Sequence, residues 1–164
     1  DEKRKYYSTD VDSASIGVGR VAIESETLEH DIIINGSFTG NLKLSINKKD
    51  LDIAIDLIQI KPNGEVFYLS DYIGRASYAK DSANRQLLKP NKIEVIPVKN
   101  ASFVSKKIEK GSKLVLLFGV SKSKYWQINY GTGKDVSDES IVDADIPLEV
   151  KWYNDSYIEI PIID

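Results

Sequence analysis

The chain has 164 residues, of which 41% are hydrophobic and 29% are charged, and these proportions are typical of one globular domain with a hydrophobic core. Its net charge of −3, with acidic and basic residues interspersed, excludes the basic surface that nucleic acid or an anionic membrane surface requires. Because the chain has no cysteine, disulfide frameworks, thiolate metal sites and cysteine nucleophiles are excluded as well.

Targeting and membrane signals are absent from the sequence. No apolar run approaches the roughly 20 residues of a membrane-spanning helix, and the first ten residues lack the apolar segment of a signal peptide. We therefore expect no membrane partner, and the compartment, whether cytoplasmic or exported in a bacterium, stays open. The chain contains no Met and begins within a pattern, which indicates a processed protein or a piece of a longer one.

The first half of the chain predicts short strands after a polar lead-in. Residues 1–19 are polar and rich in small side chains, so we interpret them as a linker with one short strand near residues 5–8, and we assign 20–164 to the folded domain. Strands are then expected at residues 20–25, at 31–35 with its β-branched isoleucine triplet, and at 41–47. In the last of these, Leu42, Leu44 and Ile46 alternate with polar residues, which is typical of a half-buried antiparallel strand.

Residues 51–70 predict a long hairpin around which the rest of the chain packs. Ile53, Ile55 and Leu57 alternate with less apolar residues, and then Ile58 and Ile60 carry apolar character on the opposite phase. Either a β-bulge lies near positions 57–58, or the far end of the strand is covered on both faces. The segment 61–64 reads Lys-Pro-Asn-Gly, a turn sequence, and a strand returns over 66–69.

The second half predicts an irregular segment followed by more strands. We expect at most one or two helical turns within 74–88, since this segment is short and rich in Ser and Asn. Strands are expected at 92–98, with Pro97 at a sheet edge or bulge, at 113–121, at 146–153 and at 157–162. Residues 114–118 are apolar on both faces and indicate a fully covered central strand. About eight to ten strands with hardly any helix predict an all-β fold, a two-sheet jelly-roll sandwich.

The sequence supplies few candidates for catalysis. A serine triad would need His30, the one histidine, as its base, and no G-x-S-x-G segment presents a nucleophile. The pair of glycines in Gly17-Val18-Gly19 lacks the third glycine and the helix of a dinucleotide-binding loop. We therefore predict no catalytic residue in this chain and no cofactor.

Two clusters are candidate binding sites. Clustered acidic residues could supply oxygen ligands to calcium, but their spacing matches no EF-hand loop, and the pattern favours a solvated, turn-rich acidic loop. These residues are Asp135, Asp138, Glu139, Asp143 and Asp145. An aromatic run could form a sugar-stacking platform, or its rings could pack on the sandwich or a neighbouring domain. This run contains Tyr125, Trp126 and Tyr130.

Six short motifs follow one another over about three quarters of the chain. They are an aspartate-led strand, Asp52 to Ile60, with the turn Pro62-Asn63-Gly64; Asp71, Arg75, Ala76 and Tyr78; Leu88, Pro90, Asn91 and Ile93; the strand Gly111 to Ser121; Tyr125, Asn129 and Gly133; and the segment Ser156 to Ile162. Their order resembles the C-terminal, non-catalytic jelly-roll domain of the CocE/NonD and X-prolyl dipeptidyl-peptidase family of serine hydrolases, which includes cocaine esterase and α-amino-acid ester hydrolases.

The sequence also departs from that family's pattern. Tyr72 stands where the family usually has glycine, and Gly74 follows two places later. Ser112 and Val115 replace the histidine and the second arginine of the family's G-H-R-L-R strand, and Trp126 replaces a common proline. The strand pattern itself is unaffected.

The resemblance implies a galactose-binding-domain-like sandwich that packs on the α/β-hydrolase domain of the same parent chain and helps to shape its substrate cleft. The parent would be a serine hydrolase of esters, amides or X-Pro peptides, and this chain alone would be non-catalytic. This hypothesis predicts an exposed apolar patch on one sheet. The alternatives are a stand-alone carbohydrate-binding module and an adhesion sandwich stabilised by calcium. A homo-oligomer remains possible.

Overall fold

The computed structural model describes residues 2–6, 20–123 and 125–163, and it shows an all-β sandwich, as the sequence predicts. One layer is a four-stranded antiparallel sheet in the order β2–β9–β5–β6. Its strands are β2 (Val21–Glu24), β5 (Asp52–Ile60), β6 (Val66–Arg75) and β9 (Lys113–Val120). We call its two sides the inner face, toward the other layer, and the outer face. Strand β6 is one edge of this sheet.

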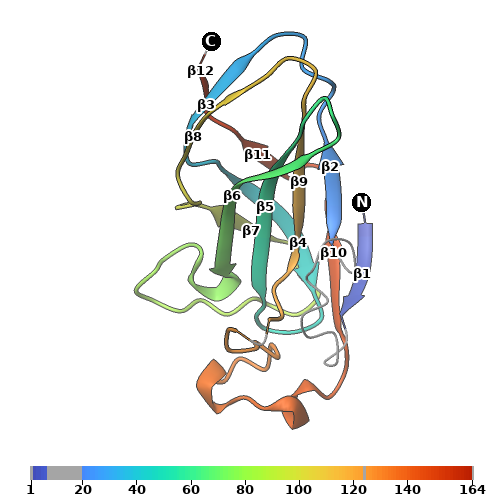
Figure 1. Cartoon of the computed structure of the whole chain (residues 1–164). Coiled ribbons are helices and arrows are strands. Elements are labelled where there is room, and N and C mark those ends of the chain that lie inside the picture. Colours follow the sequence, from blue (N-terminus) through green and yellow to red (C-terminus); the bar gives the residue numbers. More distant parts are fainter. Residues whose placement is uncertain (1, 7–19, 124, 164) are drawn as a thin grey trace.

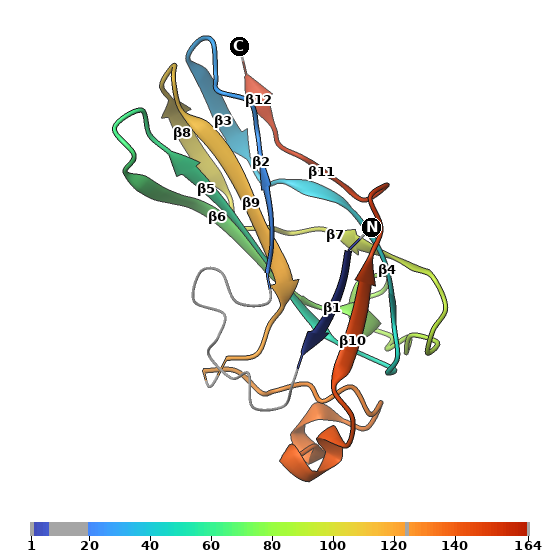
Figure 2. The same ribbon diagram turned by 90° about the vertical axis from the view of Figure 1, so that its right-hand side faces the viewer.

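The second layer consists of two antiparallel sheets placed end to end (Figure 1). The larger contains β1 (Glu2–Tyr6), β4 (Thr39–Ile46), β7 (Glu94–Val98), β10 (Leu148–Trp152) and β11 (Tyr157–Glu159). The smaller contains β3 (Ile32–Gly36), β8 (Val104–Ile108) and β12 (Ile162–Ile163). Since β3 leads into β4 and β11 into β12, both sheets belong to one layer; Figure 2 shows β4, β10 and β11 opposite β5, β6 and β9.

The core lies between the two layers and follows the alternation of the sequence. Leu42, Leu44 and Ile46 of β4 are buried against the inner face of the opposite layer, as predicted. Phe118 and Trp152 join the layers with an edge-to-face contact, their ring centroids 5.2 Å apart and the rings at 86°. Each fully buried aliphatic side chain contributes about 1.5–3 kcal/mol to stability, so this core is sufficient to hold a domain with hardly any helix.

The central hairpin has a β-bulge at positions 57–58, one of the two alternatives that the sequence leaves open, but the extra residue belongs to the returning strand. Leu57 pairs with Ser70 and Ile58 pairs with Tyr68, so Leu69 of β6 is left over. The alternation of β5 does not slip, because Gln59 is fully buried on the inner face and donates to the Ser112 hydroxyl at 2.9 Å. Ile58 and Ile60 therefore lie on the outer face.

Strand β9 is the covered central strand that the sequence predicts. It lies between β2 and β5, and it alternates Leu114, Leu116 and Phe118 toward the core. On the outer face Val115 and Leu117 are also buried, at 4% and 9% exposure. The strand is thus apolar on both faces, as expected.

Turns and short 3-10 helices complete the domain. In the hairpin turn Gly64 has a φ of 84°, and the Gly64 amide donates to the Lys61 carbonyl at 2.8 Å. The helices are η1 (Ala76–Tyr78), η2 (Val136–Asp138) and η3 (Ile141–Ala144). The first agrees with the helical turn expected within 74–88, while the other two lie in the long connection between β9 and β10, at the end of the sandwich opposite the C-terminus (Figure 1).

Several boundaries differ from those predicted. Strand β8 is not predicted by the sequence, β6 extends six residues beyond the expected Leu69, and Ile146 is exposed and precedes β10. The last predicted strand is divided into β11 and β12 by Ile160 and Pro161. In the lead-in, β1 pairs with β10; the boundary at residue 19 stays a prediction, and residues 7–19, with Gly17-Val18-Gly19, lie outside the described residues.

Candidate functional site

A polar cluster at one end of the outer face joins three of the sequence motifs. The Arg75 guanidinium donates to both carboxylate oxygens of Asp52, at 2.8 and 3.0 Å. The Asn129 amide donates to the same carboxylate at 3.0 Å, and its own oxygen accepts from the Gly131 amide at 2.9 Å. Asp52 begins β5, Arg75 ends β6, and Asn129 belongs to the connection between β9 and β10. The motif residues therefore form one bidentate ion pair that fixes this connection to the hairpin.

A second polar cluster contains a fully buried carboxylate, that of Asp50. Asp50 accepts from the Ser77 amide and hydroxyl, at 3.0 and 2.7 Å, and from the Arg85 guanidinium at 3.0 Å. Arg85 also donates to the Lys134 carbonyl at 2.7 Å. Because Asp50 has a partner for each carboxylate oxygen, its burial is offset by charge-assisted hydrogen bonds.

Two further side chains order the backbone of the β9–β10 connection. The Lys48 ammonium donates to the carbonyls of Tyr130 and Ala144, at 3.0 and 2.6 Å, and burial lowers the pKa of Lys48. Glu139 accepts from the Tyr130 and Thr132 amides at 2.7 and 2.9 Å. This connection is therefore a well-bonded platform at the end of the sandwich.

The structure places the predicted aromatic run on that platform, with two rings outward. Tyr125 is 80% exposed and Trp126 is 61% exposed, while Tyr130 is half-buried. The first two side chains therefore do not pack into the sandwich. A sugar platform or a contact with a neighbouring domain stays a prediction.

The predicted acidic residues have protein partners of their own. Asp135 accepts from the Ser137 amide and hydroxyl at 3.0 and 2.8 Å, and these hydrogen bonds lower its pKa. Asp143 pairs with the Lys134 ammonium, which lowers the pKa of Asp143, and it accepts from the Ser140 amide at 2.9 Å. Within 2–6, 20–123 and 125–163 no group of three or more His, Asp or Glu residues could hold a metal ion. Calcium binding by Asp135, Asp138, Asp143 and Asp145 stays a prediction.

The outer face of the β2–β9–β5–β6 sheet carries apolar side chains in cross-strand rows. Ile58 lies between Val115 and Tyr68, and Ile60 pairs with Val66. At the other end of the strands Ala54 pairs with Ile73. The β6 members of these rows are strongly exposed, Val66 at 57%, Tyr68 at 54% and Ile73 at 49%.

Charged groups lie between these rows. Asp56 pairs with the Arg20 guanidinium and accepts from the Tyr68 hydroxyl at 3.2 Å. Burial and the nearby carboxylates of Asp56 and Asp71 raise the pKa of Tyr68, so its hydroxyl stays protonated. We call this mixed but largely apolar surface of β6, which runs from Val66 through Tyr68 to Ile73 on the outer face, the outer-face patch. Large exposed apolar surfaces mark interaction sites.

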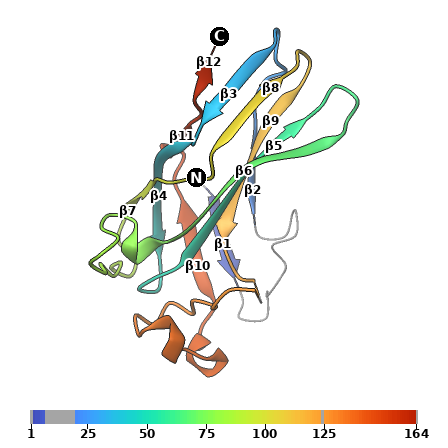
Figure 3. The same cartoon turned by 60° about the vertical axis from the view of Figure 1, so that its left-hand side comes forward.

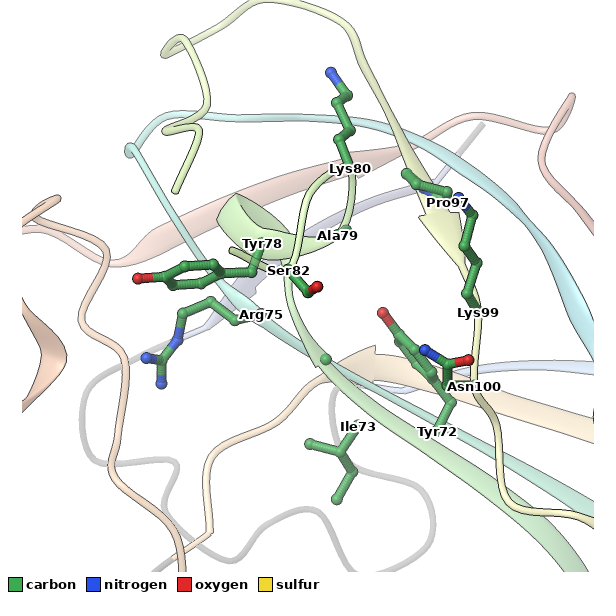
Figure 4. A pocket seen from close by; sticks show the side chains of 11 residues that line it. Tyr72, Ile73, Arg75, Tyr78, Ala79, Lys80, Ser82, Pro97, Lys99 and Asn100 are labelled. Atoms are coloured by element: carbon green, nitrogen blue, oxygen red, sulfur yellow. The ribbon is translucent and has the colours of Figure 1, made fainter. Parts of the chain in front are cut away.

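A cavity of about 340 Å³ opens beside this patch, where the end of β6 approaches the end of β7 (Figure 4). Figure 3 shows the end of β6 turning into η1 beside β7. Tyr72, Ser82 and Asn100 point into the cavity, whereas Tyr78 and Arg75 turn away from it (Figure 4). Sequence patterns do not predict this site, because segments 72–82 and 97–100 meet through tertiary packing. The one indication in that region is the departure from the family's pattern, in which Tyr72 replaces glycine and Gly74 follows two places later.

Comparisons with known proteins agree with the resemblance seen in the sequence. The family model of the X-Pro dipeptidyl-peptidase C-terminal non-catalytic domain matches residues 5–151. No curated protein sequence matches the chain. No helix of the described residues is long and apolar enough to cross a membrane.

Several solved structures share the fold. An aminopeptidase from a marine sediment Thaumarchaeota archaeon has a TM-score of 0.82 and 18% identity, with 93% of this chain and 27% of that chain covered. An α-amino acid ester hydrolase has a TM-score of 0.80 and 17% identity over 97% of this chain and 27% of that one. A CocE/NonD family hydrolase from Staphylococcus aureus has a TM-score of 0.68 and 13% identity over 99% and 33%. The chain thus spans between 27% and 33% of the length of these proteins.

Proposed function

The chain belongs to the family of X-Pro dipeptidyl-peptidase C-terminal non-catalytic domains, and on that basis we propose that it is the accessory domain of a serine hydrolase. In this proposal the outer-face patch packs on the α/β-hydrolase domain of the same parent chain, and the domain helps to shape the substrate cleft. The parent hydrolyses esters, amides or X-Pro peptides through an acyl-enzyme. This chain by itself is non-catalytic.

The observation that carries the proposal is the outer-face patch. Val66, Tyr68 and Ile73 extend along one edge of a sheet whose central residues Val115 and Leu117 are already buried. A sheet that faced water on this side would alternate apolar and polar side chains. The surface instead has the composition of an interface, because it is apolar with one aromatic side chain, Tyr68, and an ion pair between Asp56 and Arg20.

The first test is the sequence that precedes Asp1 in the natural gene product. We expect an α/β-hydrolase pattern with a G-x-S-x-G nucleophile segment. A stop codon or an unrelated domain immediately upstream would refute the proposal.

The second test changes the patch in the full parent polypeptide. Val66→Lys places an ammonium group in the contact, and Val95→Lys is the matched control, because Val95 is 45% exposed on the outer side of the opposite layer. We expect Val66→Lys to weaken domain docking by about tenfold or more, since an unpaired charge is costly to desolvate. Limited proteolysis between the domains and kcat/KM on an X-Pro p-nitroanilide measure the effect. Equal behaviour of the two variants would contradict docking on this face.

A second function is supported by the aromatic run. The exposed Tyr125 and Trp126 have the amphipathic rings that sugar-binding platforms use. The chain has two tryptophans, and Trp152 is only 3% exposed, so a sugar that stacks on the run changes the fluorescence of Trp126 alone. Loss of the response in Trp126→Phe would support a carbohydrate-binding module. An unchanged emission with a panel of soluble glycans would exclude it.

A further inference from the structure

The cavity between β6 and β7 has hydrogen-bonding groups that the protein leaves unused. Tyr72 is only 8% exposed, yet its hydroxyl points into the cavity and has no hydrogen-bond partner among the described residues (Figure 4). Ser82 and Asn100 point toward the same space, and neither side chain has a protein partner within that part of the chain. Ser82 and Asn100 are exposed, so water hydrates these groups in the free protein. A ligand that enters the cavity can take the place of that water and bond to the same groups.

The charge of the cavity defines the chemistry of that ligand. Lys99 lies along one wall beside Pro97, and no carboxylate is among the residues that line the cavity (Figure 4). Lys80 stands at the rim, where its ammonium pairs with the Glu94 carboxylate at 3.0 Å. Burial raises the pKa of Tyr72, so its phenol remains a donor at neutral pH. Donors that converge next to the Lys99 ammonium favour an anionic acceptor, and a carboxylate forms charge-assisted hydrogen bonds with them.

The edge of β6 defines the shape of the ligand. The Asp71 carbonyl is bonded by the Ser102 amide at 2.8 Å, which lies on the side of β6 away from β5. In an antiparallel ladder successive residues alternate between the two sides, so the amide and carbonyl of Ile73 also face away from β5. These backbone groups line the cavity and have no partner among the described residues. An extended peptide can therefore pair with Ile73 by β-strand addition.

We propose that this cavity binds an extended peptide segment, which pairs with the Ile73 backbone and places a carboxylate side chain against Tyr72, Asn100 and Lys99. The volume of about 340 Å³ accommodates one acidic side chain and the adjoining backbone, and is of the size of a small-ligand pocket. The site adjoins the Ile73 end of the outer-face patch, whereas Val66 lies at the other end of β6.

Three blocked peptides test the proposal on the 164-residue chain. The first is acetyl-Thr-Val-Asp-Val-Thr-amide, the second has Asn in place of Asp, and the third carries an N-methyl group on the Asp amide nitrogen. We expect the first peptide to bind by titration calorimetry and to shift the Ile73 amide signal in the NMR spectrum. The Asn peptide should bind at least tenfold more weakly, and the N-methylated peptide should lose the Ile73 shift.

Two matched substitutions locate the site. Tyr72→Phe removes only a hydroxyl that has no protein partner, so we expect an unchanged melting temperature and about tenfold weaker binding of the Asp peptide. Tyr78→Phe is the control, because the Tyr78 ring turns away from the cavity (Figure 4). This variant should bind the Asp peptide as tightly as the unsubstituted chain does. Lys99→Gln should weaken the Asp peptide about threefold and leave the Asn peptide unchanged.

The outcomes separate this proposal from others. Equal affinity of the Asp and Asn peptides, shifts confined to other regions, or no binding at millimolar concentration would each overturn it. Sodium acetate that produces the full Ile73 shift would also overturn it, since the site would then recognise a free carboxylate and no peptide backbone. Because Val66→Lys should leave peptide binding intact, failure here is distinct from failure of domain docking.

Discussion

Asn91 adopts a backbone conformation that favours glycine. Its φ is 62°, in the left-handed region. Asparagine tolerates this left-handed conformation better than most residues with a side chain. The Asn91 amide donates to the Ile46 carbonyl at 2.6 Å, so the turn also anchors the connection before β7 to β4.

Two substitutions at Asn91 test this conformational account. Asn91→Gly should leave the free energy of unfolding within about 0.5 kcal/mol of the value for the unsubstituted chain, and Asn91→Ala should lower it by about 1 kcal/mol. Urea denaturation measures both values. If the alanine variant were as stable as the glycine variant, the positive φ would not be the reason for Asn91.

Tyr72 and Gly74 form a compensated departure from the family's pattern. A Cβ at Gly74 would overlap the Tyr72 hydroxyl and ring, since both residues lie on the same face of β6. Position 74 therefore requires glycine, because the Tyr72 ring lies over it. Compared with the family's pattern, the glycine stands two places later along the strand. The exchange also leaves the phenol aimed into the cavity (Figure 4).

Gly74→Ala tests that close approach. Overpacking costs about 1–3 kcal/mol, so we expect a loss of stability in that range, measured by urea denaturation. In the background of Tyr72→Ala the same change should cost much less, because the overlapping ring is gone. A purely additive double-mutant cycle would argue against contact between the two residues.

At the scale of elements, the buried Asp50 holds Arg85, which in turn donates to the Lys134 carbonyl of the β9–β10 connection. Replacing it in Asp50→Asn leaves the Arg85 guanidinium, which is 21% exposed, without its anionic partner. We expect a loss of about 2–3 kcal/mol, at the low end for a buried ion pair because Arg85 keeps some solvent. Asp155→Asn is the control, since Asp155 pairs with Lys43 in solvent, and its thermal unfolding should match the parent.

The acidic connection between β9 and β10 should also respond to pH. In the folded protein the pKa of Asp135 is lowered by its Ser137 hydrogen bonds and that of Asp143 by Lys134. Because both pKa values lie below those of the unfolded chain, the stabilisation is present above the ordinary carboxylate range and is lost as the pH falls through the lowered values. The protection factors of the Ser137 and Ser140 amides, the intrinsic exchange rate divided by the observed rate, should fall there, and Asp135→Asn should abolish this fall at Ser137. Protection factors that stay constant with pH in the unsubstituted chain would contradict this account.

The strands differ in how far the sequence could predict them. Strand β4 has a clean two-residue alternation and was located within two residues. Strand β8 escaped notice because Val104 and Ile108, its buried ends, enclose Ser105, Lys106 and Lys107. The phase change in β5 predicts either a bulge or a strand covered on both faces. The extra residue of the bulge, Leu69, lies in the partner strand, because a pattern in one strand cannot specify which partner carries the insertion.

At the scale of the whole molecule, the sandwich followed from the sequence and the site did not. Periodicity and turn residues are local signals, and they suffice for an all-β assignment. The cavity needs the ends of β6 and β7 to meet across two layers, and the outer-face patch needs the register of the hairpin. The exposure of Trp126 is likewise a tertiary property that the aromatic run alone could not supply.

The outer-face patch predicts a property of the 164-residue chain on its own. Without a covering domain, exposed apolar rows should bind a hydrophobic dye such as ANS. Val66→Lys should reduce the dye fluorescence, and Val95→Lys should leave it close to the parent value. If Val66→Lys left the dye binding unchanged, the exposed apolar surface that binds the dye would lie elsewhere on the domain.

The pairing of β4 has a consequence for synthesis on the ribosome. Val150 to Trp152 pair with Leu44 to Ile46, and β11 pairs with β4 beyond them. Translation proceeds from the N-terminus at about 5–20 residues per second, so the nascent β4 waits several seconds for these neighbours to emerge. During that interval β4 can pair only with β7, which is synthesised earlier, and the edge that later receives β10 and β11 is open to other polypeptides.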